Sequence, residues 1–458
     1  MVLYKINKLA FIKNKLFLSI LGLVLSVSIF TPNKLTALTI IKDAEISNTL
    51  KKISEPIYKA AQINADQISI ILIQNNEMNA FVINNKSIYF TTELLLQLKS
   101  PAMLQAVIAH EVAHIQSGHI IRNRLNLGKL KARTDLGLLA GILIGSTFDT
   151  DAGLAVTIGS KSLAQKNYFK HSRGNEITAD AISLKLLTEA QINPASAVKV
   201  MDLFLQQEKL LNSNLNKYDR THPLSNDRKK YMNDIIKQNG EVNYSSDDNI
   251  VYLHKRMLAK LSAFLREPKD TLRQIKTDEV NEITLLKKTI ALHLKPDPTN
   301  AFINLKKLRN LNPDDPYFLE LEGQMYLETG QPMRATNSFK EASKLIPDEP
   351  TLLVWLGICY LAAENEKNDL EALEVFKSAY IIDPVNPKLL QYLALTYARL
   401  NHPGLASLFT AERFFIAGEF KSAESHAKKA ERLLEKSSVE WQKAQDILHI
   451  SSYIGENN

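Results

Sequence analysis

Apolar side chains recur at helical spacing in two stretches near the start of the chain. Between Lys42 and Ile63 they stand three or four positions apart, which predicts an amphipathic helix. A second helix is predicted to begin at Ser100-Pro101, because a serine followed by proline is typical of a helix N-terminus. Its apolar positions continue toward Gly118, so the segment HEVAH at 110–114 is expected to lie inside a helix.

Two segments between these helices have the composition of short strands. Residues 67–74 are rich in isoleucine and alternate weakly, which predicts one strand. The segment 79–91 (NAFVINNKSIYFT) predicts two more, joined by a tight turn at Asn84-Asn85. We therefore expect an α+β, mainly helical domain over residues 38–246, with a small sheet that has an edge strand.

From about Leu286 onward the pattern becomes periodic, with a repeat of 34 residues. The recurring positions are Ala301, Leu305, Leu308 and Pro313, which return as Ala335, Phe339, Ala342 and Pro347, and Gly323 and Tyr326, which return as Gly357 and Tyr360. This period is typical of the tetratricopeptide repeat, in which each unit is a pair of packed helices. Residues 286–458 are expected to form an all-α solenoid, with a blurred helix around 402–410 and a terminal cap at 438–453. Linking helices are expected at 247–285.

Charge and composition restrict the function classes. The chain carries +7 formally, but residues 1–37 contain five lysines and no acid, so the remainder stands at only +2 (51 basic against 49 acidic residues). That balance gives no reason to expect a nucleic-acid partner. The single cysteine, Cys359, excludes an intrachain disulfide, and its apolar neighbours predict a buried helical residue rather than a reactive thiol.

The first 37 residues have the features of an export signal. Four lysines precede the apolar run from Leu16 to Phe30, which is 15 residues long. A membrane-spanning helix needs about 20. We expect a signal peptide over 1–37, cleaved near Ala37 or retained as an anchor. A second apolar segment, 135–160, is expected to form a buried or flexible loop pair, or else to touch a bilayer surface or a partner.

The segment HEVAH carries the first candidate chemistry. In a helix, His110 and His114 are four residues apart and project from one face, where both can hold a zinc ion. Glu111 lies on the flank of that face, where a carboxylate can take a proton from an attacking water. Chance matches to this short motif occur, and the bland alternative is an amphipathic helix that carries two histidines.

A second pair of carboxylates makes the metal interpretation more specific. Glu176 and Asp180, in the segment SRGNEITAD, are again four residues apart, so we expect Glu176 to be the third ligand. Asp180 is then placed to accept the free ring N–H of a liganding histidine. A solvated acidic face is the alternative, but apolar residues beside the pair predict a buried helix. These residues are Ile177, Ala179, Ile182 and Leu184.

Two further histidines are ambiguous. A metzincin site needs a histidine where this chain has Ile120, and His119 would lie about 140° around the helix from His114, so we expect it to face elsewhere. His222 stands in a Thr-His-Pro turn that is followed by Arg228. By itself this turn predicts an exposed histidine.

HEVAH, SRGNEITAD and THPLSNDR together resemble the M48 family of zinc peptidases, and the segment MNAFVINNKSIYFTTELL resembles the edge strand of that family. The resemblance implies a gluzincin-type endopeptidase with one Zn²⁺ per chain. His110, His114 and Glu176 would be its ligands, Glu111 its general base and Asp180 a supporting carboxylate.

The resemblance also implies a substrate and a place of action. Such an enzyme would act in the periplasm on unfolded or stalled outer-membrane proteins, with the repeats recruiting substrate or the outer-membrane assembly machinery. Asn79, Ala80 and Phe81 would offer an edge to which an extended substrate adds as a strand. His222 would border the cleft, and it is a possible fourth ligand that leaves when substrate arrives. The competing class is a tetratricopeptide adaptor or chaperone with little proteolytic activity, but the intact Glu111 favours an enzyme.

Overall fold

The computed structural model describes residues 39–119, 172–210, 222, 226–238, 244, 247–275 and 281–456. The expected signal peptide and the apolar segment 135–160 lie outside these residues. All contacts described below lie within the compact unit Leu38–Asn458. None of the described helices is long and apolar enough to cross a membrane.

A small mixed sheet lies in the N-terminal half. Its strands are β1 (Thr39–Ile41), β2 (Ser69–Gln74), β3 (Ala80–Val82) and β4 (Ser87–Thr91), in the order β1-β2-β4-β3. The central pair β2 and β4 is parallel, and both outer pairs are antiparallel. The hairpin predicted around Asn84-Asn85 is confirmed, with the Lys86 N–H donating to Asn84 Oδ1 over 2.8 Å. Strand β1 was not predicted, because three residues are too few for an alternation pattern.

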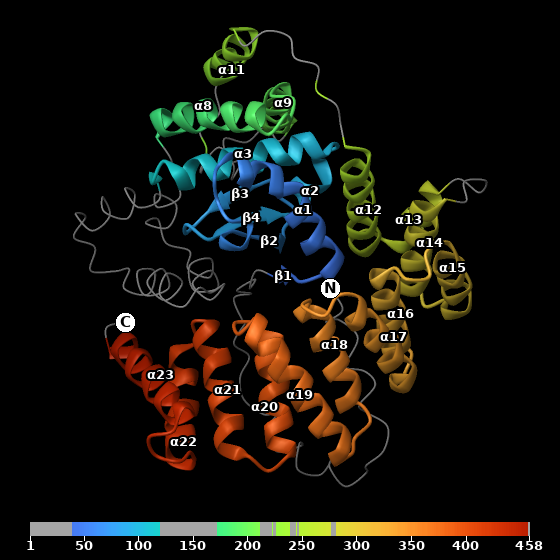
Figure 1. The fold of residues 1–458 in the computed structure, drawn as a ribbon, viewed down its shortest axis with the longest axis vertical. Helices are drawn as coiled ribbons and strands as arrows, with labels where there is room; N and C mark the ends of the chain where they lie inside the picture. Colours follow the sequence, from blue (N-terminus) through green and yellow to red (C-terminus); the bar gives the residue numbers. More distant parts are fainter. Residues whose placement is uncertain are drawn as a thin grey trace, which may run out of the picture. The chain divides into compact units, whose positions relative to one another are not determined.

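Helices cover this sheet and include the one that carries HEVAH. They are α1 (Ala44–Ala60), α2 (Thr92–Gln97), α3 (Pro101–Gln116), α8 (Arg173–Glu189), α9 (Ala195–Leu210) and α11 (Asn226–Gln238). The Ser100 side chain caps α3 by accepting from the Met103 N–H, as its position before proline predicts. Every side chain from Leu104 to His114 is buried, because α3 packs between the sheet with α1 on one side and α8 with α9 on the other (Figure 1).

The rest of the described chain is entirely helical. Two linking helices, α12 (Asp248–Leu265) and α13 (Pro268–Gln274), precede successive packed pairs. The repeat helices are α14 (Glu282–Leu294), α15 (Pro298–Leu311), α16 (Pro316–Glu328), α17 (Pro332–Leu345), α18 (Pro350–Leu361), α19 (Glu366–Ile382), α20 (Pro387–Arg399), α21 (Pro403–Ile416), α22 (Phe420–Leu433) and α23 (Val439–Glu456). The expected solenoid is confirmed, and the blurred stretch around 402–410 is the regular helix α21.

Close contacts explain the periodic residues. A Cβ atom added at Gly323 would lie 2.6 Å from the Phe339 ring, so only glycine lets α17 approach α16 this closely. Gly357 and Phe376 repeat the arrangement one unit later. Cys359 is buried as expected, and burial raises the pKa of its thiol to about 12.

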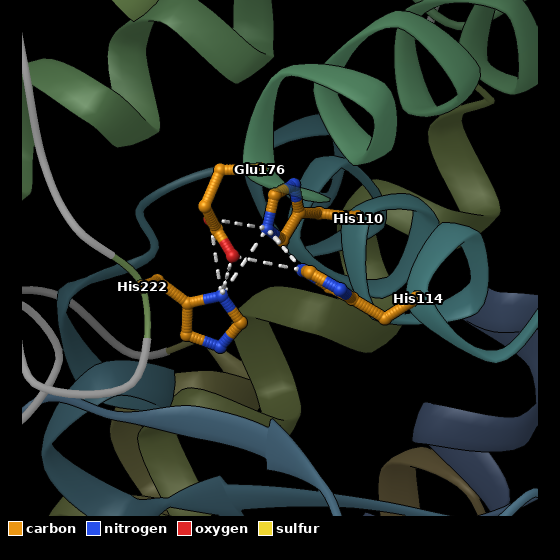
Figure 2. A group of neighbouring side chains, drawn as sticks. All are labelled: His110, His114, Glu176 and His222. Atoms are coloured by element: carbon orange, nitrogen blue, oxygen red, sulfur yellow. Dashed lines mark hydrogen bonds and ion pairs between the residues drawn. The ribbon is translucent and has the colours of Figure 1, made fainter. Parts of the chain in front are cut away.

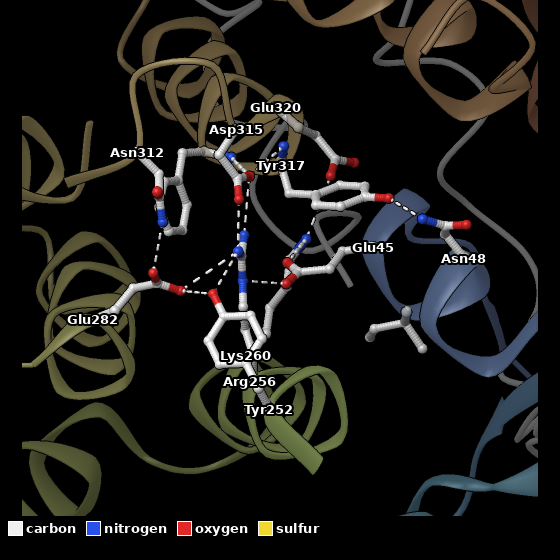
Figure 3. A network of polar contacts seen from close by, with 12 residues as sticks. Glu45, Asn48, Tyr252, Arg256, Lys260, Glu282, Asn312, Asp315, Tyr317 and Glu320 are labelled. Carbon is white, nitrogen blue, oxygen red and sulfur yellow. Dashed lines mark hydrogen bonds and ion pairs between the residues drawn. The ribbon is translucent and has the colours of Figure 1, made fainter. Parts of the chain in front are cut away.

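A buried ionic network links α12 to α1 and to the N-terminal end of α16 (Figure 3). Arg256 lies 2.6 Å from Glu45 of α1 and 2.6 Å from Asp315 at the start of α16. The Lys260 ammonium contacts Asp43, Glu45 and Glu320 at 2.9–3.3 Å. Burial alone would lower the pKa of Lys260, but these carboxylates raise it well above its usual range. Lys260 therefore neutralises carboxylates from two parts of the chain.

Lys260→Met should destabilise the protein strongly, because it leaves three carboxylates around a site without its cation. Removal of one partner from a buried ion pair costs about 3–5 kcal/mol. The matched control is Lys51→Met, which removes a lysine from the exposed pair with Asp66 and should leave the unfolding midpoint unchanged. Urea unfolding of both variants measures the difference. Equal midpoints would show that the network does not stabilise the fold.

Candidate metal centre

Helix α3 presents two imidazoles on one face (Figure 2). The Nε2 atoms of His110 and His114 are 3.1 Å apart, because residues four apart in a helix lie one above the other. Both side chains are buried. The helix spacing thus brings together two metal-type ligands, as the sequence predicts.

Helix α8 supplies two carboxylates that face α3. Ser172 caps this helix, and Glu176 lies in its first turn. The Glu176 oxygens lie 3.3 Å from His114 Nε2 and 3.4 Å from His110 Nε2. Asp180 Oδ1 lies 3.3 Å from the other ring nitrogen of His110, where it can accept the Nδ1–H.

The apolar residues beside this pair do not all behave as predicted. Ala179 and Leu184 are buried, but Ile177 is 42% exposed. The helix buries the face that carries Glu176 and Asp180, and Ile177 follows Glu176 directly, about 100° around the helix. The expectation that Ile177 marks a buried face was therefore wrong.

His222 joins the same group, so the expectation of an exposed turn histidine was also wrong. Its side chain is fully buried, with Nδ1 at 3.2 Å from Glu176 Oε1 and 3.4 Å from His110 Nε2. Its Nε2 lies 3.5 Å from Glu111 Oε1. The family resemblance implied that His222 borders the cleft, but no local pattern predicts its contact with His110, which lies 112 positions away.

Arg228 of α11 holds both carboxylates of α8, a role that the sequence did not reveal. Its Nε and Nη2 donate to the two Asp180 oxygens over 2.7 and 2.8 Å, and Nη1 lies 2.9 Å from Glu176 Oε2. Burial would raise the pKa of Asp180, but Arg228 and His110 hold it below its usual range. The only signal was the position of Arg228 six residues after His222, and a turn explains that equally well.

His119 does not face away as expected. Its Nδ1 lies 3.0 Å from Nδ1 of His114, and its side chain is buried. The helical angle fails here because α3 ends at Gln116 and Gly118 adopts a left-handed φ of +64°. The chain turns back on the helix end and returns His119 to His114.

The four central residues fit one tetrahedral metal ion. The candidate ligand atoms of His110, His114, Glu176 and His222 all lie within 4.8 Å of one another. Bonds of about 2.0–2.1 Å to zinc give a tetrahedron with edges of roughly 3.3–3.4 Å. The separations given above cover five of the six pairs, with either Glu176 oxygen, and run from 3.1 to 3.4 Å, close to that edge. Two or three imidazoles and one carboxylate are also a donor set that zinc prefers.

Protons compete with a metal for this group. Burial alone would lower the pKa of His110, but Asp180 and Glu176 raise it to about 10. Burial lowers the pKa of His114 to about 3, so this ring is neutral. A metal ion must therefore displace a proton from His110, and acid should weaken its binding.

Glu111 lies beside the ligands and is fully buried. Its two oxygens accept no hydrogen bond within the described part of the chain. Burial raises the pKa of this carboxyl group, against the opposing effect of His222 and His110. A buried carboxylate that accepts no hydrogen bond is costly, and such groups are found mainly at functional sites.

The residues predicted to form a substrate edge lie in or beside strand β3, which packs against α3. Strand β3 is the last strand of the described sheet, packs near α3 and contains Ala80 and Phe81. Asn79 precedes it, and its backbone exchanges hydrogen bonds with Thr91 of β4. Within the described residues, the sheet ends at β3.

Comparison with known proteins agrees with this site. The model of Peptidase family M48 matches residues 43–236. A beta-barrel assembly-enhancing protease of Yersinia pestis is 23% identical over 359 residues, covering 77% of this chain and 72% of the relative. The protein of that name in Escherichia coli (strain K12) is 24% identical over 303 residues, covering 58% of this chain and 62% of the relative.

A third relative matches a shorter part of the chain. Mitochondrial metalloendopeptidase OMA1 of Saccharomyces cerevisiae is 25% identical over 214 residues, covering 44% of this chain and 58% of the relative. Residues 43–236, which hold His110, His114 and Glu176, are therefore an M48 metallopeptidase domain, and helical repeats follow it in the chain.

Proposed function

We propose that this chain is a zinc-dependent endopeptidase of the bacterial periplasm that degrades misfolded or stalled envelope proteins. The observation that carries the proposal is the buried group of His110, His114, Glu176 and His222, with Glu111 beside it. The donor set and its spacing favour zinc. The names of the Yersinia and Escherichia relatives, which refer to beta-barrel assembly, support outer-membrane proteins as the substrate class.

The catalytic roles follow from the positions of the side chains. When bound, zinc supplies Lewis-acid polarisation of the peptide carbonyl and of the attacking water. Glu111 accepts a proton from that water at a carboxylate oxygen and passes it to the leaving amine. Asp180 and Arg228 keep His110 and Glu176 in place, since each is hydrogen-bonded or ion-paired to a ligand. Burial of the whole group excludes bulk water from the charges.

The edge strand determines which substrates are accepted. Addition of an extended segment to β3 uses main-chain hydrogen bonds, which only an unfolded or locally opened chain can offer. The metal-loaded full chain should therefore degrade casein, which is unfolded, and leave a stable globular protein of similar size intact. Rapid cleavage of the folded protein, or no cleavage of either with zinc bound, would contradict the proposal.

The repeats are proposed to recruit substrates or partners. Helical repeat arrays form extended binding surfaces. Among the described residues, the cluster of possible metal ligands lies in the peptidase domain and includes no residue of the repeats. The names of the relatives make the outer-membrane assembly machinery a reasonable partner, and contact with a membrane surface fits the same location. The alternative, an adaptor or chaperone with little proteolysis, would need no buried Glu111 beside the ligands.

His222 is proposed to occupy the fourth ligand position until a substrate displaces it. Three protein ligands leave one open position on a catalytic zinc, and His222 Nδ1 lies at a ligand-like distance from His110 and Glu176. His222→Ala should keep its zinc and cleave casein or itself faster than the wild type. If His222 instead binds substrate, the zinc-loaded variant should cleave more slowly. Gel assays of both proteins at equal zinc content distinguish the two roles.

A further inference from the structure

We propose that His119 is a positioning residue for the metal ligand His114. It accepts a hydrogen bond from the His114 Nδ1–H and so keeps Nε2 of that ring directed at Glu176 and His110. The proposal rests on the metal-dependent function proposed above and assigns a role to a residue that the catalytic mechanism does not use. Its basis is the 3.0 Å separation of the two Nδ1 atoms.

The protonation of the two rings follows from this distance. Two ring nitrogens 3.0 Å apart must share one hydrogen, because two N–H groups or two lone pairs would repel each other. A neutral imidazole that binds a metal through Nε2 carries its hydrogen on Nδ1. His114 Nε2 is the atom that faces the candidate ligands, at 3.1 Å from His110 Nε2 and 3.3 Å from Glu176 Oε1. His114 is therefore the donor and His119 the acceptor.

The ring geometry agrees with an in-plane hydrogen bond. The planes of His114 and His119 meet at 65° with centroids 5.1 Å apart, so the rings meet at their edges and do not stack. Both side chains are buried, and only 2% of the His119 surface is exposed. A donor that lost its acceptor here could not turn to bulk water, and the unmet Nδ1–H would cost about 1–3 kcal/mol.

The backbone conformation after α3 places the His119 ring beside His114. The Ser117 N–H bonds to the Ala113 carbonyl and the Gly118 N–H to the Ile115 carbonyl, which closes the helix end. The left-handed φ of Gly118 then reverses the chain. A histidine five residues past a ligand can thus reach that ligand only because the helix has stopped.

An imidazole suits this position better than the carboxylate that supports His110. Three carboxylates, Glu111, Glu176 and Asp180, are already buried around the ligands, and Arg228 is ion-paired with two of them. A fourth carboxylate beside His114 would add negative charge to this buried cluster at a high desolvation cost. A neutral ring accepts the hydrogen bond without that charge.

Zinc affinity of the full chain tests the proposal without reference to activity. His119→Asn places an oxygen as many bonds from Cα as Nδ1, whereas His119→Leu has nearly the same shape and no acceptor. In competition with a chromophoric chelator, the Leu variant should bind zinc about 10–100-fold more weakly, and the Asn variant should stay close to the wild type. His254→Leu, at a buried histidine of α12, is the matched control and should leave the affinity unchanged.

A second readout reports on the metal geometry. The visible absorption of the Co²⁺-substituted protein should change in His119→Leu and not in His119→Asn. Unchanged zinc affinity in the Leu variant, or an equal loss in both variants, would overturn the proposal. If circular dichroism shows that the Leu variant does not fold, His119→Gln replaces it, because its oxygen lies one bond further out and should not restore affinity. Failure of the wild type to bind zinc would refute the proposed function as well.

Discussion

Glu111→Gln is expected to lower the turnover of casein by at least ~100-fold, within the range for a general acid or base. The amide has nearly the shape of the carboxylate but cannot accept the proton. Zinc content should not change, because His110, His114 and Glu176 are untouched. Burial raises the pKa of Glu111, and a higher pKa makes the ionised group a stronger base. Initial rates at saturating casein, together with metal analysis, measure both effects.

The matched control for this variant is Glu55→Gln. Glu55 lies on the exposed side of α1 and should tolerate the same change without loss of activity. A fully active Glu111→Gln protein would refute its assignment as the base. Loss of zinc from that variant would mean that Glu111 serves the metal instead.

Glu176→Ala is expected to lose both activity and most of the bound zinc. The change removes the only carboxylate from a ligand set that otherwise holds His110, His114 and the displaceable His222, and this carboxylate contacts all three histidines. The change also removes one of the carboxylates that Arg228 contacts. Metal analysis after gel filtration gives the stoichiometry directly.

Glu189→Ala removes a largely exposed acid from the same helix and is the control for Glu176→Ala. It should keep both zinc and activity. If Glu176→Ala retained its zinc while His119→Leu lost it completely, the third ligand would be His119 and the assignment of Glu176 would be wrong.

The sequence predicted contacts that depend on a single helix. Four-residue spacing was enough to place His110 above His114 and Glu176 above Asp180, because side chains at that spacing share a helix face. The repeat units were predictable for a similar reason, since a glycine opposite an aromatic ring recurs at a fixed period. In both cases short-range geometry determines the outcome.

Contacts between helices were predicted only where the chemistry demanded them, as for Glu176, which was expected to meet the histidines of α3 because zinc needs a third ligand. Other tertiary contacts, and those at a helix end, were not predicted. Arg228 reaches Asp180 across 48 positions, and no pattern in either segment points to the other. The position of His119 was wrongly predicted because helical geometry was extended past Gln116, where the helix ends. Arg256 and Lys260 stand at polar positions of the predicted linking helix, and their burial beside carboxylates of α1 and α16 depends on tertiary structure.

The most direct test of the account is proteolysis as a function of metal content. Casein degradation by the full chain should stop after dialysis against a chelator and return when zinc is added, with full activity at one zinc ion per chain. Glu111→Gln should bind the same amount of zinc and remain inactive throughout. Casein degradation that persists in metal-free protein, or that zinc-loaded Glu111→Gln performs at the wild-type rate, would contradict a metallopeptidase built on His110, His114 and Glu176.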